Sequence, residues 1–222
     1  MTLLIGIVSQ KGCVGKSTLA RLIAREYAQA GWNVKIADLD VSQGTSFNWQ
    51  ARRLQNQIDP SVPVERFGTV DQALKQRDHY DLLILDGPPH STSGTLRIAE
   101  ASDLVVLPTG LALDDMEPSV LLAHELAKKG VLKSKIAFAF CRVGESLHEI
   151  AEAQEYIRQA GYRVLYGRVL DGTVPEKIAY RRASDEGKTL TETRFSSLNE
   201  RGDQLAQNII DLVTRLHKRK AA

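Results

Sequence analysis

Along this chain of 222 residues, short apolar runs alternate with longer amphipathic stretches. Short runs of aliphatic and β-branched residues predict strands, and the stretches between them repeat apolar residues every three or four positions, as amphipathic helices do. We expect strands at residues 3–8, 34–38, 62–67, 81–86, 103–108, 135–140 and 163–169. We expect helices at residues 17–30, 45–57, 70–77, 94–101, 115–129, 147–160, 175–183 and 197–217. This alternation predicts an α/β fold, with a doubly wound and mostly parallel sheet in three layers.

The last predicted helix has one apolar face. It carries Leu205, Ile209, Leu212, Val213 and Leu216 at helical spacing. Packing of this face against the sheet is the interpretation we favour, and a helix lying on a membrane surface is the alternative.

The composition of the chain mainly rules out classes of protein. The fractions of charged residues, 25%, and of hydrophobic residues, 43%, are those of an ordinary globular protein, and no linker-like stretch interrupts the chain, so we expect a single domain over residues 1–222. No run approaches the roughly 18 apolar residues of a membrane span, and no basic flank precedes the first strand as in a signal peptide. Only Cys13 and Cys141 are present, which excludes a disulfide framework. We therefore expect a cytoplasmic protein with no membrane partner.

The segment SQKGCVGKST, residues 9–18, joins the first strand to the first helix. Gly12 and Gly15 let the backbone approach phosphate oxygens, Lys16 can reach the β and γ phosphates, and the Ser17 hydroxyl can bind Mg²⁺. The common phosphate-loop pattern has a glycine where Gln10 stands, and this loop has an additional lysine, Lys11.

Two strands end in acidic residues. VKIADLD places Asp38 at a strand end and Asp40 two residues later, and YDLLILDGPP ends a strand of four apolar residues at Asp86. In open α/β sheets, ligands bind beyond the carboxyl ends of the strands. Asp86 is the expected Mg²⁺ residue, acting through water.

KGCVGKST resembles the deviant Walker A motif of the ParA/MinD ATPases, whose fold is that of the P-loop NTPases. The resemblance implies an ATP–Mg²⁺ sandwich homodimer in which Lys11 reaches the partner's nucleotide. It implies catalytic roles for Lys11, Lys16 and Asp40, with Asp40 aligning the attacking water. The implied metal site is Ser17, Asp38 and Asp86. The implied nucleotide-binding residues are Lys11, Gly12, Cys13, Val14, Gly15, Lys16, Ser17, Thr18 and Pro175.

The sequence departs from the family pattern in three places. Cys13 replaces a glycine, which a negative φ would make a tolerated substitution; the alternative is a reactive thiol that ATP protects from alkylation. Val41 and Ser42 replace the single proline of the family's acidic motif. Cys141 replaces an asparagine that helps to hold adenine, so the adenine contacts are left open.

The chain most resembles the small partition ATPases, because it starts at its first strand and is expected to lack an N-terminal DNA-binding extension. This implies ATP-dependent binding to nonspecific DNA on the nucleoid and weak hydrolysis that a centromere-binding adaptor, ParB-like or ParG-like, stimulates during plasmid partition. The candidate DNA contacts are Arg181, Arg182, Lys188, Arg194 and Lys218. The alternatives are a MinD-like membrane or cargo positioning ATPase, an iron-sulfur reductase component related to the nitrogenase iron protein, and a P-loop small-molecule kinase or ligase.

Overall fold

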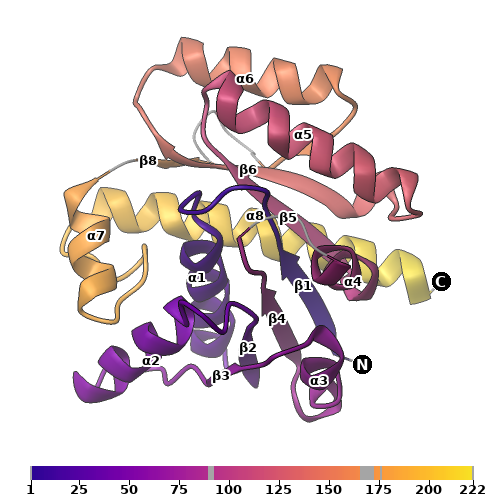
Figure 1. Cartoon of the computed structure of the whole chain (residues 1–222). Coiled ribbons are helices and arrows are strands. Elements are labelled where there is room, and N and C mark those ends of the chain that lie inside the picture. Colours follow the sequence, from indigo (N-terminus) through magenta and orange to yellow (C-terminus); the bar gives the residue numbers. More distant parts are fainter. Residues whose placement is uncertain (1, 90–92, 166–172, 176, 222) are drawn as a thin grey trace.

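Parallel strands form one sheet through the molecule (Figure 1). The computed structural model describes residues 2–89, 93–165, 173–175 and 177–221. The strand order is β3-β2-β4-β1-β5-β6-β7, with β8 also paired to β6, and every pairing among the described strands is parallel. The strands are β1 (Leu3–Ile7), β2 (Val34–Asp38), β3 (Val64–Arg66), β4 (Leu82–Asp86), β5 (Leu104–Thr109), β6 (Ile136–Val143), β7 (Arg163–Val164) and β8 (Thr173–Pro175).

Helices cover both faces of this sheet (Figure 1). They are α1 (Lys16–Gln29), α2 (Thr45–Gln55), α3 (Val70–Leu74), α4 (Ser93–Ala101), α5 (Leu113–Lys128), α6 (Leu147–Gln159), α7 (Ile178–Asp185) and α8 (Ser196–Ala221). One apolar cluster joins the sheet to α1, α2, α7 and α8, and a second joins it to α3, α4, α5 and α6. The structure therefore confirms the predicted three-layer, doubly wound fold.

The two clusters form because each central strand is buried on both faces. In β1, Ile5 and Ile7 belong to one cluster, and Leu4 belongs to the other. Each such side chain contributes about 1.5–3 kcal/mol when fully buried. Burial on both faces explains why the strand sequences are continuous apolar runs and do not alternate between apolar and polar residues.

The apolar face of α8 packs against the sheet, which confirms the core-packing interpretation. Leu205, Ile209, Leu212 and Val213 are all buried in the α1 cluster, and Leu216 packs partly against it. Among the described residues, no helix is both long enough and apolar enough to cross a membrane.

The edge strand β8 was not expected from the sequence. It pairs with the end of β6 and contains Pro175, a residue that edge strands tolerate because no ladder hydrogen bond needs its missing N–H. The predicted helix at 175–183 consequently begins later, at Ile178. The predicted strand at 163–169 begins as β7, and residues 166–172 lie outside the described part of the chain.

The strand order places a crevice at the carboxyl edge of the sheet. The chain leaves β1 toward β2 on one side and later crosses from β4 to β5 on the other. A reversal of this kind separates the loops that follow neighbouring strands, and ligands of open α/β sheets bind there.

Candidate functional site

The loop after β1 presents free backbone amides at the start of a long helix. Gly15 is the N-cap residue of α1, with a φ of 107°, and no side chain among the described residues caps the helix. A Cβ at this position would lie 3.0 Å from both the Cβ and the Sγ of Cys141, so only glycine fits. The uncapped N–H groups of the first turn and the positive end of the helix dipole favour an anion here.

Lys16 adds a cation to this anion site. Its side chain is buried, and Nζ donates to Ser9 Oγ at 3.0 Å and to the Lys11 carbonyl at 3.2 Å. Burial lowers the pKa of Lys16, and the charges of Asp86 and Asp40 oppose that change. No carboxylate lies within ion-pair distance of Lys16 in the described part of the chain. A phosphate would supply the missing counter-charge.

Asp38 organises the turn that follows β2. Its carboxylate accepts hydrogen bonds from Ser46 N at 3.0 Å, Phe47 N at 3.1 Å and Asp40 N at 3.2 Å. The first two of these amides belong to the start of α2, so Asp38 holds that helix against the sheet edge. Burial nevertheless raises the pKa of Asp38. The contacts give Asp38 a positioning role, and its support of a metal shell stays a prediction.

Asp86, at the end of β4, is almost fully buried, as Asp38 is. It lies beside Asp38 in the β2–β4 register, and its Oδ2 accepts a hydrogen bond from Ser46 Oγ at 2.7 Å. Within the part of the chain that the structure describes, its Oδ1 is buried and has no hydrogen-bond partner. Burial, followed by the charge of Asp38, raises the pKa of Asp86 to about 6.

The unpartnered oxygen of Asp86 fits a magnesium ion. The Ser17 side chain interacts with the same carboxylate and lowers its pKa, which places the hydroxyl beside it. Among the described residues, no cluster of three or more His, Cys, Asp or Glu could hold a metal. Mg²⁺ needs no such cluster, because it is commonly held by one or two carboxylates together with water and phosphate oxygens.

A cavity of about 290 Å³ collects most of the predicted nucleotide-binding residues. Asp40 reaches its wall from a turn in which Asp40 Oδ1 accepts hydrogen bonds from Ser42 Oγ at 2.7 Å and Gln43 N at 3.1 Å. Lys11 and Val14 do not line this cavity. The predicted residues that do line it are Gly12, Cys13, Gly15, Lys16, Ser17, Thr18 and Asp40.

Lys11 points to a residue of its own subunit. Its Nζ forms an ion pair with Asp115 Oδ1 at 2.9 Å, in the first turn of α5. The two side chains are 41% and 35% exposed, so the pair contributes at most about 1 kcal/mol. The reach of Lys11 to a partner subunit stays a prediction.

Sequence reasoning missed Arg21 and Ser46. Arg21 is buried and donates to the Thr45 carbonyl at 2.8 Å and to Ser184 Oγ at 3.0 Å. Its Nε also donates to Ser46 Oγ at 3.4 Å, and Ser46 in turn donates to Asp86. Burial lowers the pKa of Arg21 to about 10. The sequence did contain a signal for Arg21. It is a charged residue between Ala20 and Leu22, on a face of the first helix that is otherwise apolar.

A second cavity, of about 370 Å³, adjoins the first and shares Thr18, Arg21, Arg142, Val174 and Ser184 with it. Arg142 Nη1 donates to the Cys13 carbonyl at 3.2 Å, so the end of β6 contacts the phosphate loop. The Cys141 thiol lies toward Gly15, and burial raises its pKa to about 12. Pro175 lies in β8, but its side chain is outside the described part of the structure, so its predicted contact with the base stays a prediction.

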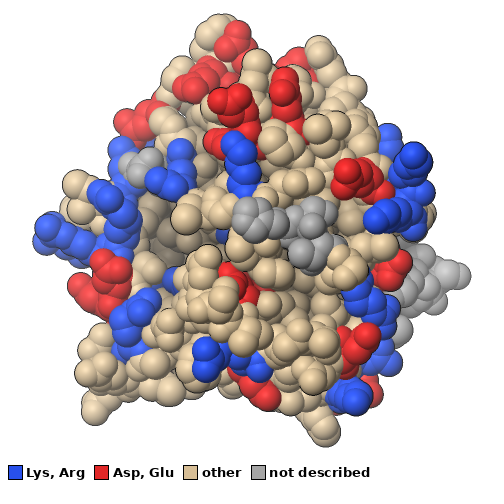
Figure 2. All heavy atoms as spheres, viewed as in Figure 1, with Lys and Arg blue, Asp and Glu red and all other residues tan. Residues whose placement is uncertain are grey.

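The five predicted DNA contacts do not form one surface. Arg181 lines the second cavity, whereas Arg182 and Arg194 line a separate groove, and Lys188 lies at both. Lys218 lies on α8 and is exposed. Basic side chains gather over α7 at the left of the molecule in Figure 2.

Cys13 does not have the negative φ that would make it a simple substitution for glycine. Its φ is 59°, in the left-handed region. A residue other than glycine costs about 1–2 kcal/mol in this region. The condition for a tolerated substitution is therefore not met, and the cysteine is held in a conformation that favours glycine.

Replacing Cys13 by Gly should therefore raise the free energy of unfolding by about 1 kcal/mol. Cys13→Ala is the matched control, because it removes the thiol and keeps the strain. Urea denaturation of the three proteins measures the effect. Equal stability of the Gly and Ala variants would contradict the assignment of strain.

Comparisons with known proteins identify the family and the fold. A model of the CobQ/CobB/MinD/ParA nucleotide binding domain matches residues 5–190. The septum site-determining protein MinD of Pyrococcus horikoshii, complexed with Mg-ADP, superposes with a TM-score of 0.75 at 17% identity, covering 97% of this chain and 99% of that one. A plasmid partition protein of Borrelia burgdorferi, bound to AMPPNP, superposes with a TM-score of 0.69 at 18% identity, covering 97% and 99%. At these identities the structures show the fold alone.

A sequence relative is named for another activity. An iron-sulfur cluster carrier protein of Aquifex aeolicus is 25% identical over 229 residues. The match covers 84% of this chain, which spans 61% of that relative's length.

Proposed function

Because the chain belongs to the CobQ/CobB/MinD/ParA nucleotide-binding family, we propose that it is an ATPase that binds ATP with Mg²⁺ and hydrolyses it within a homodimer. The observation that carries the proposal is the buried, unpartnered Oδ1 of Asp86 near a phosphate loop whose lysine also has no ion-pair partner among the described residues. A metal–triphosphate complex supplies both missing partners.

Each group has a part in phosphoryl transfer to water. Lys16 and the amides of the α1 N-terminus hold the phosphates, and Ser17 and Asp86 hold the magnesium ion, which neutralises phosphate charge when bound. Asp40, on the cavity wall, orients the attacking water. Asp38 keeps Asp40 and α2 in place through the amides that it binds. Catalysis of this kind depends mainly on positioning and electrostatic stabilisation.

The dimer completes the site through Lys11. In the single subunit this lysine binds Asp115 and does not line the cavity, so its charge is available to a second copy. The weak, half-exposed ion pair does not compete strongly with a triphosphate for the ammonium group.

For the cargo we propose nonspecific DNA, with a centromere-binding adaptor stimulating hydrolysis during plasmid partition. The basic side chains over α7 support this proposal, because phosphate contacts need clustered cations (Figure 2). Lys218 is exposed on α8 and is proposed as a separate contact. The fold likeness to a plasmid partition protein is compatible with it.

An iron-sulfur cargo does not fit the cysteines of this chain. Thiolates are the usual ligands of such clusters, and the sequence has only Cys13 and Cys141. Cys141 is 3% exposed, and burial holds its thiol protonated. Two copies would thus offer one accessible thiol each, fewer than a four-cysteine cluster requires.

Hydrolysis by the wild type and by Asp40→Ala tests the proposal. We expect slow Mg²⁺-dependent ATP hydrolysis by the wild type, and an Asp40→Ala protein that binds ATP, dimerises and hydrolyses at least about 100-fold more slowly. Asp78→Ala, which removes an exposed carboxylate far from the cavity, is the control. Full activity of Asp40→Ala would remove its catalytic role.

The DNA proposal needs a separate measurement. Binding of a fluorescent duplex of arbitrary sequence should require ATP and weaken steeply with salt. Binding to anionic vesicles instead of DNA would favour the membrane-positioning alternative.

A further inference from the structure

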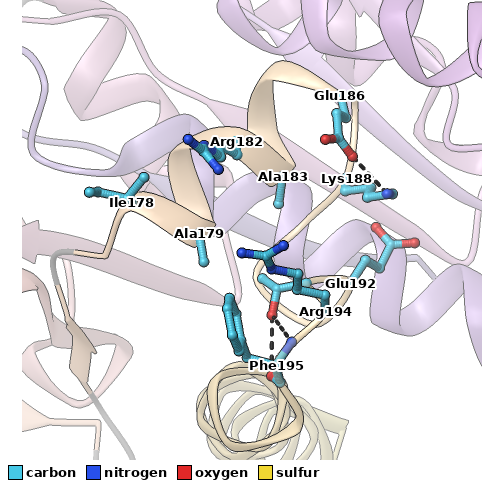
Figure 3. A pocket seen from close by; sticks show the side chains of 10 residues that line it. Ile178, Ala179, Arg182, Ala183, Glu186, Lys188, Glu192, Arg194 and Phe195 are labelled. Carbon is cyan, nitrogen blue, oxygen red and sulfur yellow. Dashed lines mark hydrogen bonds and ion pairs between the residues drawn. The ribbon is translucent and has the colours of Figure 1, made fainter.

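A groove of about 380 Å³ lies between α7 and the segment 188–195 (Figure 3). The residues of α7 divide between this groove and the cavity beside the nucleotide site. Ile178, Ala179, Arg182 and Ala183 line the groove, while Tyr180, Arg181 and Ser184 line the cavity. Positions three and four apart share a helix face, so α7 is a partition between the two spaces.

Apolar walls and a floor of small residues shape the groove. Ala179 and Ala183 lie one turn apart on α7, and Ile178 and Phe195 remain 61% and 43% exposed at its sides. In Figure 3 the Phe195 ring lies across the groove from α7. Thr193 Oγ1 accepts a hydrogen bond from Phe195 N at 3.1 Å, which fixes the backbone that carries the ring.

The segment that forms the second wall is held in place by polar contacts. Asn199 Oδ1 accepts hydrogen bonds from Thr193 N at 2.9 Å and from Thr193 Oγ1 at 2.7 Å. Glu192 pairs with the buried Arg53 at 2.8 Å. A groove that is formed before binding loses little entropy when it is occupied.

The groove has unbalanced positive charge. Of the two glutamates that line the groove, Glu192 forms an ion pair with Arg53, and Glu186 forms an ion pair with Lys188 at 2.7 Å. Arg194 stacks on Phe195, with Cζ 4.9 Å from the ring centroid. No carboxylate forms an ion pair with Arg182 or Arg194 in the described part of the chain. Both guanidinium groups therefore remain available to acidic groups of a ligand.

We propose that this groove docks an acidic, apolar peptide segment of a protein partner. An apolar side chain enters between Phe195 and α7, and flanking carboxylates bind Arg182 and Arg194. Nucleic acid fits less well, because phosphate contacts require cations and no apolar walls. Arg182 and Arg194 are accordingly assigned to the partner, which leaves Arg181, Lys188 and Lys218 as the proposed DNA contacts.

The position of α7 couples this groove to the nucleotide site. Ser184, on the opposite face of α7, accepts a hydrogen bond from Arg21, which also donates to Ser46, the hydrogen-bond partner of Asp86. Docking that shifts α7 therefore changes the surroundings of Asp86. This coupling rests on the proposed function, whereas docking itself does not.

Selection from a peptide library tests the docking. Random 12-residue peptides are displayed and selected on the full chain without nucleotide, and synthetic copies of the selected peptides are titrated by fluorescence anisotropy. We expect enrichment of Asp and Glu around Leu or Phe, and at least a tenfold weaker affinity for Arg182→Glu/Arg194→Glu. Lys128→Glu/Lys129→Glu, the same charge change at the end of α5, is the matched control.

A second variant separates shape from charge. Ala179→Trp fills the groove and keeps both arginines, so it should also abolish peptide binding while circular dichroism shows an intact fold. Selection of basic or neutral peptides, or wild-type affinity in either groove variant, overturns the proposal. Tighter binding of a 20-nucleotide poly-dT strand than of any selected peptide at the same arginines overturns it in favour of nucleic acid.

Coupling is measured with the same peptides. Adding AMP-PNP and Mg²⁺ should change the peptide Kd at least threefold in the wild type and leave it unchanged in Ser184→Ala, which cannot accept the Arg21 hydrogen bond. An unchanged Kd in the wild type, with nucleotide binding confirmed separately, would overturn the coupling. A protein that binds no nucleotide would refute the proposed function and leave the docking result standing.

Discussion

Replacing Asp86 by Asn is expected to raise the free energy of unfolding of the metal-free protein by about 2–3 kcal/mol at pH 8. Burial and the charge of Asp38 raise the pKa of Asp86 to about 6 from an ordinary value of 3.8. At pH 8 the wild type therefore carries a buried carboxylate whose charge is poorly compensated. A shift of one pKa unit corresponds to about 1.4 kcal/mol, which sets the size of the effect.

The sign of the pH dependence follows from the direction of this shift. The folded state binds the Asp86 proton more tightly than the unfolded state, so this group stabilises the fold fully below about pH 4. Its contribution is lost as pH rises through about 6. Burial raises the pKa of Asp38 as well, so a smaller slope of the same sign should remain in Asp86→Asn.

Urea denaturation in EDTA between pH 4 and 8 measures the effect, and Asp78→Asn, an exposed carboxylate, is the control. Adding Mg²⁺ and AMP-PNP should then raise the Tm of the wild type more than that of Asp86→Asn, because the neutral amide lacks the negative charge that would hold the metal. A variant that is less stable than the wild type at pH 8 would contradict the poorly compensated charge of Asp86. A variant that keeps the full response to Mg²⁺ and nucleotide would contradict its metal role.

Replacing Lys11 by Ala is expected to abolish ATP-dependent dimerisation and to reduce stimulated hydrolysis by at least about 1,000-fold. A cation supplied by a second subunit to a transferring phosphoryl group contributes a factor of this order. Nucleotide binding by the single subunit should fall only slightly, because Lys16 and the α1 N-terminus remain. Light scattering with AMP-PNP and steady-state hydrolysis measure the two effects.

The matched variant is Asp115→Asn, which removes the other half of the ion pair. Because that pair is half-exposed and contributes at most about 1 kcal/mol, the variant should dimerise as well as the wild type or up to about fivefold better per subunit. If Lys11→Ala and Asp115→Asn lost dimerisation equally, Lys11 would act through its own subunit. Wild-type dimerisation of Lys11→Ala would remove the shared site altogether.

The phosphate loop and the acids at the strand ends could be predicted because their chemistry is local in the sequence. Lys16 and Ser17 follow Gly15 directly, and the apolar run before Asp86 marks a buried strand. Parallel pairing then brings Asp86 beside Asp38, as expected for strands that end at one edge. The conformation of Cys13 could not be predicted, because a left-handed φ depends on how the loop closes onto α1.

The order of apolar runs and amphipathic stretches determined the layered fold by itself, since burial on both faces of a parallel sheet requires it. The glycines, lysines and strand-end acids likewise predicted the loop and the carboxylates that the proposed function uses. Only the tertiary structure decided which distant groups meet: Lys11 with Asp115, Arg21 with Ser184, and α7 with the segment that carries Phe195. These contacts join elements far apart in the chain, and their distances depend on how helices pack across the sheet, which no local pattern records.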